Sequence, residues 1–233
     1  MRFSAALIDL DGTLVNTVPD LADATNAMRT ELGLPPLAVD VVAHYVGKGA
    51  DHLVMRALST PLNQPPDTDL FQRGLALFNQ HYEAVNGVKS RLYNGVVTGL
   101  KQLKAQNLKL AVVTNKPAQF VHPLLLALGL SHYFDLVVCG DTCAKKKPDP
   151  MPLLHACNLL AVKPETAVVI GDSANDALAA QAAGIVSLAV PYGYHGGRGV
   201  QNLPVDDIVA DIEDAARWML TQPPRQVSPA GTP

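Results

Sequence analysis

Residues 3–14 read FSAALIDLDGTL, an apolar run that ends in Asp9 and continues to a second acid, Asp11, just before Gly12. Short apolar runs of the same kind recur along the chain, at Phe3–Leu10, Lys109–Thr114, Leu136–Cys139, Ala167–Ile170, Val186–Val190 and Asp207–Val209. Helical patterns follow several of them, at Pro117–Leu128, Met151–Leu160, Asn175–Ala183 and Ile212–Leu220. This alternation is typical of a parallel sheet with helical crossovers. The sequence therefore predicts an α/β fold with a doubly wound, mostly parallel sheet.

The first crossover is much longer than the others, because the second predicted strand begins only at Lys109. Between residues 17 and 87 the apolar residues recur at helical spacing. They form two stripes, Leu21, Thr25, Met28 and Leu32 in one and Phe71, Leu75, Phe78 and Tyr82 in the other. We therefore expect a core of residues 1–16 and 88–222 and an inserted helical cap of residues 17–87. Residues 223–233, rich in proline and poor in apolar side chains, are expected to form a disordered tail.

Composition limits the classes of partner. The chain has 233 residues and a formal net charge of -3, so it offers no broad basic surface. A nucleic acid or an anionic membrane is therefore not an expected partner, and a small soluble molecule fits better. The N-terminal apolar run stops at Asp9, too early for a membrane span or a secretory leader, which predicts a cytoplasmic protein. The oligomeric state is left open between monomer and homodimer.

Polar side chains gather where the predicted strands end. Asp9 and Asp11 follow the first strand, and Thr114 and Asn115 follow the second. Lys147 lies in the loop after the third strand, and Asp172 and Asp176 come directly after the fourth. In open α/β sheets, ligands bind beyond the carboxyl ends of the strands. The sequence therefore predicts one site that contains all of these residues.

The residue types indicate phosphoryl transfer. Neighbouring aspartates repel one another, and a magnesium ion with its preference for oxygen ligands resolves that conflict. Asp9 can then attack phosphorus, and Asp11 can serve as acid and then base. Thr114 and Asn115 can donate to phosphoryl oxygens, while Lys147 neutralises their charge. Each motif alone also fits a turn, a helix cap or a solvated charge run, and their occurrence in order at strand ends favours catalysis.

The four motifs are Asp9–Val15, Val112–Asn115, Lys147 in Lys-Pro-Asp-Pro, and Gly171–Asp176. Together they resemble those of the haloacid dehalogenase superfamily of phosphatases, over nearly the whole chain. The resemblance implies a Rossmann-like core with a helical cap, and Asp9 and Asp172 as side-chain ligands of Mg²⁺. It also implies that Asp11 adds a backbone carbonyl to the metal and that Asp176 supports it from an outer shell. True dehalogenases of the superfamily lack the second acid of the first motif, so Asp11 argues against dehalogenation.

Weaker marks are similar to the bacterial phosphoglycolate phosphatases within that superfamily. They are Pro19–Leu21, Val46–Asp51, Thr114–Pro117 and Val190–Tyr194. This similarity implies hydrolysis of 2-phosphoglycolate to glycolate and phosphate. Lys48, between two glycines of the predicted cap, is a hypothetical partner for the carboxylate of that substrate. Arg198, in a glycine-rich segment interpreted as a mobile loop near the mouth of the site, is a weaker candidate.

Two alternatives remain open at this point. The same scaffold could serve a phosphatase or phosphomutase that acts on a sugar phosphate, or a pyrophosphatase. A catalytically idle ligand-binding protein is the alternative from another class, although every polar residue that the chemistry needs is present.

Overall fold

The computed structural model describes residues 2–60, 64–195 and 199–223. Arg198 and the predicted tail beyond Pro223 therefore lie outside the described residues. At the centre is a six-stranded sheet in which every neighbouring pair is parallel. Its strands, in spatial order, are β5 (Leu136–Val138), β4 (Lys109–Val113), β1 (Ala5–Ile8), β6 (Ala167–Gly171), β7 (Val186–Ala189) and β8 (Asp207–Ile208). The predicted parallel α/β fold is confirmed.

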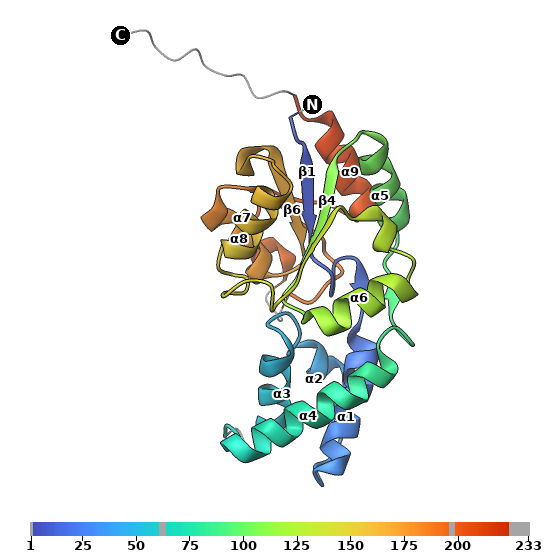
Figure 1. Cartoon of the computed structure of the whole chain (residues 1–233), viewed down its shortest axis with the longest axis vertical. Helices are drawn as coiled ribbons and strands as arrows, with labels where there is room; N and C mark the ends of the chain where they lie inside the picture. Colours follow the sequence, from blue (N-terminus) through green and yellow to red (C-terminus); the bar gives the residue numbers. More distant parts are fainter. Residues whose placement is uncertain (1, 61–63, 196–198, 224–233) are drawn as a thin grey trace, which may run out of the picture.

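Helices cover both faces of this sheet (Figure 1). The helices are α5 (Val96–Ala105), α6 (Ala118–Ala127) and α9 (Ile212–Thr221) on one face, and α7 (Met151–Leu159) and α8 (Ala174–Ala183) on the other. Successive side chains of a strand point to opposite faces. Accordingly, Ala6 and Ile8 of β1 pack with α5, α6 and α9, whereas Ala5 and Leu7 pack with α7 and α8. The central strands are therefore buried on both sides, which explains their nearly continuous apolar sequences.

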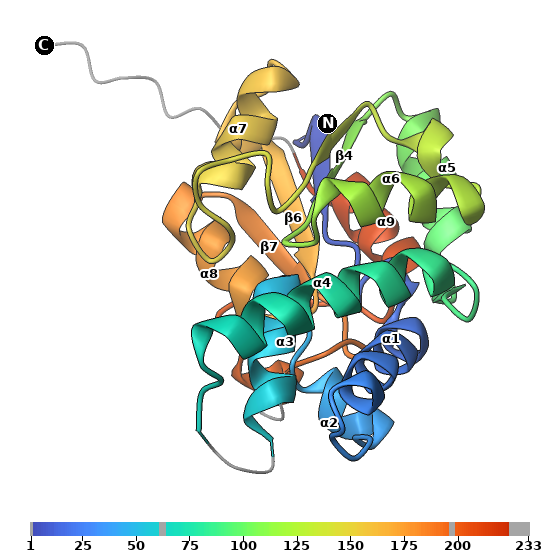
Figure 2. The ribbon, with the colours of Figure 1, turned by 60° about the horizontal axis from the view of Figure 1, so that its bottom comes forward.

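Four further helices form a separate layer beyond the carboxyl ends of the strands (Figure 1 and Figure 2). They are α1 (Val18–Glu31), α2 (Val39–Ala43), α3 (Ala50–Ser59) and α4 (Thr68–Val85). Their apolar faces meet in a cluster of their own, in which Met28, Val54 and Phe78 are fully or almost fully buried. The two apolar stripes seen in the sequence are the inner faces of α1 and α4. We refer to α1–α4 as the helical layer.

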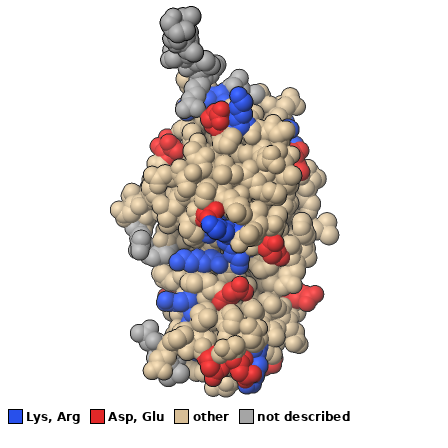
Figure 3. Space-filling view, turned by 60° about the vertical axis from the view of Figure 1, so that its left-hand side comes forward, with Lys and Arg blue, Asp and Glu red and all other residues tan. Residues whose placement is uncertain are grey.

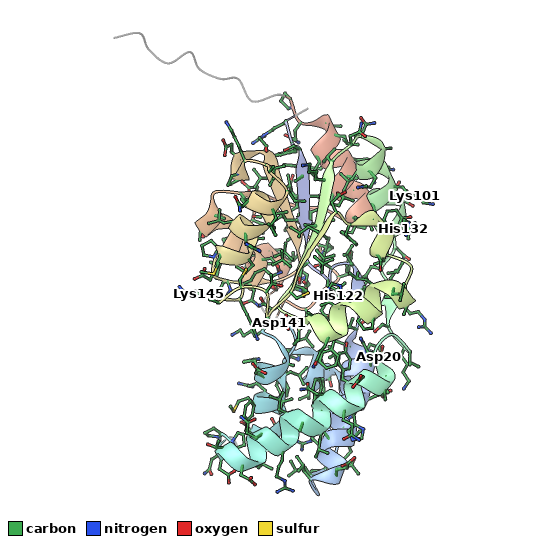
Figure 4. All side chains as sticks on the ribbon, in the orientation of Figure 1. Asp20, Lys101, His122, His132, Asp141 and Lys145 are labelled. Atoms are coloured by element: carbon green, nitrogen blue, oxygen red, sulfur yellow. The ribbon has the colours of Figure 1, made fainter. Side chains whose placement is uncertain are left out.

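The chain leaves and re-enters the core at adjacent points. The short strand β2 (Val15–Asn16) precedes the helical layer in the sequence, and β3 (Arg91–Leu92) follows it. The two strands pair with each other in antiparallel fashion. Next to them, the buried carboxylate of Asp20 accepts hydrogen bonds from the backbone N–H groups of Gly87, Lys89 and Ser90 and from the Ser90 hydroxyl. Figure 4 labels Asp20 at this junction. The domain limits 16/17 and 87/88 stay a prediction, and these contacts lie at both of them.

Three of these elements, β2, β3 and α5 (Val96–Ala105), have no counterpart among the expected ones. The strands β2 and β3 have two residues each, too few for a periodic pattern. The helix α5 begins with Val96, Val97 and Thr98, which are modest helix formers, and contains Gly99. The glycine has a packing reason, because a Cβ at position 99 would lie 2.3 Å from the backbone oxygen of Ile212. The weak local signal of α5 therefore reflects its close approach to α9.

Candidate active site

The sheet topology places the first predicted residues together. Successive crossovers from β1 run first to β4 and β5 on one side and later to β6 and β7 on the other. A crevice forms where this direction reverses, between β1 and β6. Asp9 follows β1 and Asp172 follows β6, and Ile8 and Ile170 just before them are aligned partners. One carboxylate oxygen from each of Asp9, Asp172 and Asp176 lies within 4.8 Å of the other two.

These three acids are buried, and burial changes the proton affinity of Asp9 and Asp172. Burial, opposed by Lys147 and reinforced by repulsion from Asp176, raises the pKa of Asp9 to about 7. Burial and the charges of Asp176 and Asp9 raise the pKa of Asp172 well above its usual value. Such a set of crowded oxygen donors fits a hard divalent cation, which would compensate charges that the protein leaves uncompensated. The cluster could therefore hold a metal ion.

Lys147 is the buried cation of this cluster. Its ammonium nitrogen lies 2.9 Å from Oδ1 of Asp9 and 2.6 Å from Oδ1 of Asp176, and it donates to the carbonyl oxygen of Val113. Burial alone would lower the pKa of Lys147, but the two carboxylates outweigh it and raise the pKa. The neighbouring Lys145 differs, since 64% of its side chain is exposed and it lies at the edge of the molecule (Figure 4). Of these two lysines, Lys147 therefore belongs to the site, whereas Lys145 is exposed to solvent.

Asp176 also lies in the first turn of α8 and helps to cap that helix. Its second oxygen, Oδ2, accepts from the backbone N–H and the hydroxyl of Ser173, which forms a capping box at the start of α8. Both oxygens are thus already engaged, one by Lys147 and one by Ser173. The carboxylate nevertheless belongs to the close group of three. The resemblance assigned it an outer-shell role, which stays a prediction.

Asp11 has partners outside that group of three acids. Its Oδ1 accepts from the hydroxyl of Thr17 at 2.7 Å and from the ammonium of Lys116 at 2.9 Å. Lys116 also donates to the Tyr82 hydroxyl of α4 at 2.6 Å. No role for Lys116 or Tyr82 follows from sequence reasoning. The available signals are the position of Lys116 directly after Thr114 and Asn115 and the place of Tyr82 on an apolar helical stripe.

Asp172 is oriented by two segments. It accepts from the hydroxyl of Thr13 at 3.1 Å and from the backbone N–H of Tyr194. The Tyr194 hydroxyl in turn accepts from the N–H groups of Thr17 and Val18 and donates to Asn16. Tyr194, in the glycine-rich segment, thus connects Asp172, a candidate metal ligand, to the start of α1.

Gly12 allows the backbone of the turn after Asp11 to lie close to the carboxylate of Asp172. Its φ is +90°, and a Cβ at this position would lie 2.4 Å from Oδ2 of Asp172. Glycine adopts positive φ without a steric cost and leaves room for the carboxylate. The turn after Asp11 therefore requires this residue.

A cavity opens beside Asp9 between the core and the helical layer, with about 450 Å³ of space that is partly open to solvent. Its polar wall comes from the strand ends and its apolar wall from the helical layer and α6. It is lined by Asp9, Asp11, Leu21, Val46, Gly47, Gly49, Ala50, Leu53, Phe78, Tyr82, Thr114, Asn115, Lys116, Pro117 and Phe120. Figure 3 shows basic and acidic side chains near the waist between the two parts of the molecule.

The remaining predicted residues have different surroundings. Thr114 is buried at the cavity wall, and its hydroxyl oxygen accepts from the N–H of Lys116. The Asn115 amide also reaches the wall, but it donates to the carbonyls of Gly47 and Lys147 and accepts from the N–H of Lys147. Lys48 is exposed and is not among the described residues that line the cavity. The structure thus brings Thr114 and Asn115, but not Lys48, to the cavity.

The family of the chain follows from comparison with known proteins. Residues 6–190 match the model of the haloacid dehalogenase-like hydrolase family, and the chain belongs to that family. The resemblance seen in the four motifs is thereby confirmed, and the protein is a hydrolase.

Individual relatives carry a more specific name. A protein of Nitrosospira multiformis named phosphoglycolate phosphatase is 48% identical over 93% of this chain and 96% of its own length. One of Thiobacillus denitrificans with the same name is 46% identical, over 93% of this chain and 95% of its own length. A crystal structure of a predicted phosphoglycolate phosphatase from Haemophilus somnus is 35% identical, with a TM-score of 0.89, and covers 95% of this chain and 99% of that one. The chain is thus similar over nearly its whole length to proteins that carry this name.

Proposed function

We propose that this hydrolase is a magnesium-dependent phosphomonoesterase that converts 2-phosphoglycolate to glycolate and phosphate. The observation that carries the proposal is Asp9, a buried carboxylate at the topological switch point, 2.9 Å from Lys147 and grouped with Asp172 and Asp176. The relatives named phosphoglycolate phosphatase, which match nearly the whole chain, support the choice of substrate.

In the first half-reaction, an Asp9 carboxylate oxygen attacks the phosphorus atom, and the bond between phosphorus and the ester oxygen breaks. Asp11 gives a proton to that ester oxygen, so glycolate leaves as an alcohol. The products at this stage are glycolate and an aspartyl phosphate on Asp9. Lys147 and the hydroxyl of Thr114 stabilise the charge on the transferring phosphoryl oxygens.

In the second half-reaction, water attacks the phosphorus atom of the aspartyl phosphate. Asp11, now ionised, takes a proton from that water, and the bond between phosphorus and the Asp9 oxygen breaks. Phosphate leaves, and both carboxyl groups return to their starting states. Thr17 and Lys116 hold the carboxyl group of Asp11 for these two tasks, since both contact its Oδ1.

Magnesium would be held by the carboxylates of Asp9 and Asp172 and by the backbone carbonyl of Asp11, with Asp176 in support. When bound, it supplies positive charge for the phosphate and keeps Asp9 ionised. The burial of Asp9 and Asp172 next to one another fits this requirement.

The cavity fits a small leaving group. On the side of the helical layer its wall is largely apolar, with Leu21, Leu53 and Phe78. Such a wall offers few hydrogen bonds to the hydroxyl groups of a sugar, which favours a small acid over a sugar phosphate.

A phosphate-release assay with magnesium tests the proposal. Wild-type protein is compared with Asp9→Asn on 2-phosphoglycolate, a sugar phosphate, pyrophosphate and ethyl phosphate. We expect 2-phosphoglycolate to have the highest kcat/KM, and Asp9→Asn to release no phosphate from it. Equal rates on all four compounds, or an active Asp9→Asn, would contradict the proposal. Recovery of an isomerised sugar phosphate instead of free phosphate would indicate a mutase.

Among the described residues, no helix is long and apolar enough to cross a membrane. The cytoplasmic location, the lack of nucleic-acid and membrane partners, and the choice between monomer and homodimer stay predictions from composition.

A further inference from the structure

We propose that Lys116, together with the hydroxyl group of Tyr82, binds the carboxylate of the leaving group and so determines the preference for phosphomonoesters of small hydroxy acids. The proposal rests on the proposed function and assigns the recognition to groups other than Lys48. Its basis is a pair of buried donors at the cavity wall that the catalytic steps do not fully use.

Both groups are buried and line the cavity. Lys116 is 5% exposed and Tyr82 1%, and the Lys116 ammonium lies 2.6 Å from the Tyr82 hydroxyl. Lys116 comes from the core, just after β4, whereas Tyr82 comes from α4 of the helical layer. A ligand that contacts both would therefore connect the two parts of the protein. Because apolar side chains such as Phe78 and Phe120 surround the pair, its interaction with an anion is screened less than it would be in water.

Each group retains a donor. An ammonium group has three N–H bonds. Two of those of Lys116 donate, one to Oδ1 of Asp11 and one to the Tyr82 hydroxyl. Within the part of the chain that the structure describes, no further acceptor contacts this nitrogen. The Tyr82 hydroxyl accepts from Lys116, so its own hydrogen is left for another acceptor. Burial raises the pKa of Tyr82 to about 12, which keeps this donor protonated. Two adjacent donors are thus available to the two oxygens of a carboxylate.

The position also agrees with the reaction. Asp11 protonates the ester oxygen, so that oxygen must come within hydrogen-bond distance of Asp11. In 2-phosphoglycolate a single methylene separates the ester oxygen from the carboxylate. The Lys116 ammonium, 2.9 Å from Oδ1 of Asp11, is therefore close to the place that the carboxylate must occupy.

Other lysines are less suitable. Lys147 is held by Asp9 and Asp176, and Lys146 lies 3.7 Å from Asp51. Of the described residues that line the cavity, Lys116 alone carries a positive charge. An exposed Lys48 would have to reorient to contact the substrate.

The test compares two substrates that differ in the carboxylate. kcat/KM is measured with magnesium for 2-phosphoglycolate and for ethyl phosphate, in wild type, Lys116→Met, Tyr82→Phe and Lys48→Met. The ratio of the two values removes effects on chemistry common to both, including any that Lys116 exerts through Asp11. We expect the ratio to fall roughly tenfold or more in Lys116→Met, as for the loss of one charge-assisted hydrogen bond, and by a smaller factor in Tyr82→Phe. Lys48→Met is expected to keep the wild-type ratio.

The outcomes separate the two proposals. If wild type prefers 2-phosphoglycolate and Lys116→Met keeps that preference, the role of Lys116 is overturned while the proposed substrate stands. If the ratio falls in Lys48→Met instead, Lys48 and not Lys116 binds the carboxylate of the substrate. If wild type hydrolyses both esters equally, the proposed substrate is overturned and this assignment with it. Tyr82→Phe, which keeps the aromatic ring, provides a second reading should Lys116→Met not fold.

Discussion

Replacing Asp20 by asparagine should loosen the junction between the core and the helical layer. The fully buried carboxylate accepts four hydrogen bonds, three from backbone N–H groups and one from the Ser90 hydroxyl. An asparagine of the same size keeps one acceptor oxygen, which can stay opposite Gly87 and Ser90. Its NH₂ group would then face the N–H of Lys89, so two donors would meet where a hydrogen bond existed.

The magnitude follows from these contacts. A hydrogen bond to a charged group contributes about 1.5–3 kcal/mol and a neutral one about 1 kcal/mol, so three bonds each weaken by roughly 1 kcal/mol. The fourth bond is lost, while the relief from burying a charge offsets part of the total. We therefore expect Asp20→Asn to lower the free energy of unfolding by about 3 kcal/mol, from a total of about 5–15 kcal/mol typical of such proteins.

The assay is urea unfolding followed by far-ultraviolet circular dichroism at neutral pH. Asp23→Asn is the matched control, because Asp23 lies on the same helix and pairs with Lys89 at 2.6 Å but is 43% exposed. Its midpoint is expected to stay close to that of wild type, since exposed ion pairs contribute little. The reasoning is refuted if Asp20→Asn unfolds at the wild-type urea concentration, or if Asp23→Asn is equally destabilised.

Three further outcomes are expected. Burial raises the pKa of Asp9 to about 7, so protons compete with magnesium for this carboxylate below that pH. Calorimetric titration is therefore expected to show a magnesium affinity that rises as the pH increases toward 7, and a flat profile would contradict this. Gly12→Ala forces a Cβ toward Asp172 at positive φ, so thermal unfolding is expected to show a loss of about 1–3 kcal/mol, whereas a wild-type melting temperature would speak against the described turn. Tyr194→Phe removes the hydroxyl that accepts from Thr17 and Val18, and urea unfolding is expected to show a loss of about 1–3 kcal/mol; an unchanged midpoint would mean that water replaces it fully.

The parts that sequence predicts well are those in which local pattern and tertiary surroundings agree. Strands β1, β4 and β6 are buried on both faces, so their apolar runs are conspicuous, and the helical patterns between runs indicate parallel strands. The acids that follow β1 and β6 must then lie at the same edge. Asp9, Asp172 and Asp176 could be grouped for this reason before any coordinates were known.

Other features depend on partners distant in sequence. The contacts of Lys116 with Asp11 and Tyr82 join three elements, and no spacing within the motif indicates them. Asp11 was expected in one site with the other acids, and it lines the cavity together with Asp9. The sequence did not indicate that its Oδ1 would accept hydrogen bonds from Thr17 and Lys116. Likewise, the hydrogen bonds of Asn115 to Gly47 depend on how the helical layer rests on the core.

The antiparallel pair of β2 and β3 has a consequence for how such a protein can diversify. Because Val15 is the partner of Leu92, the ends of the intervening segment are neighbours, as the ends of a hairpin loop would be. A segment of another length or shape can thus be spliced between Asn16 and Arg91 without displacing a strand of the parallel sheet. The residues that break and form the phosphorus–oxygen bonds can be inherited unchanged while the opposite wall is exchanged. The pairing of β2 with β3 thus lets the wall that carries Tyr82 change, while Lys116 and the other residues of the core stay in place.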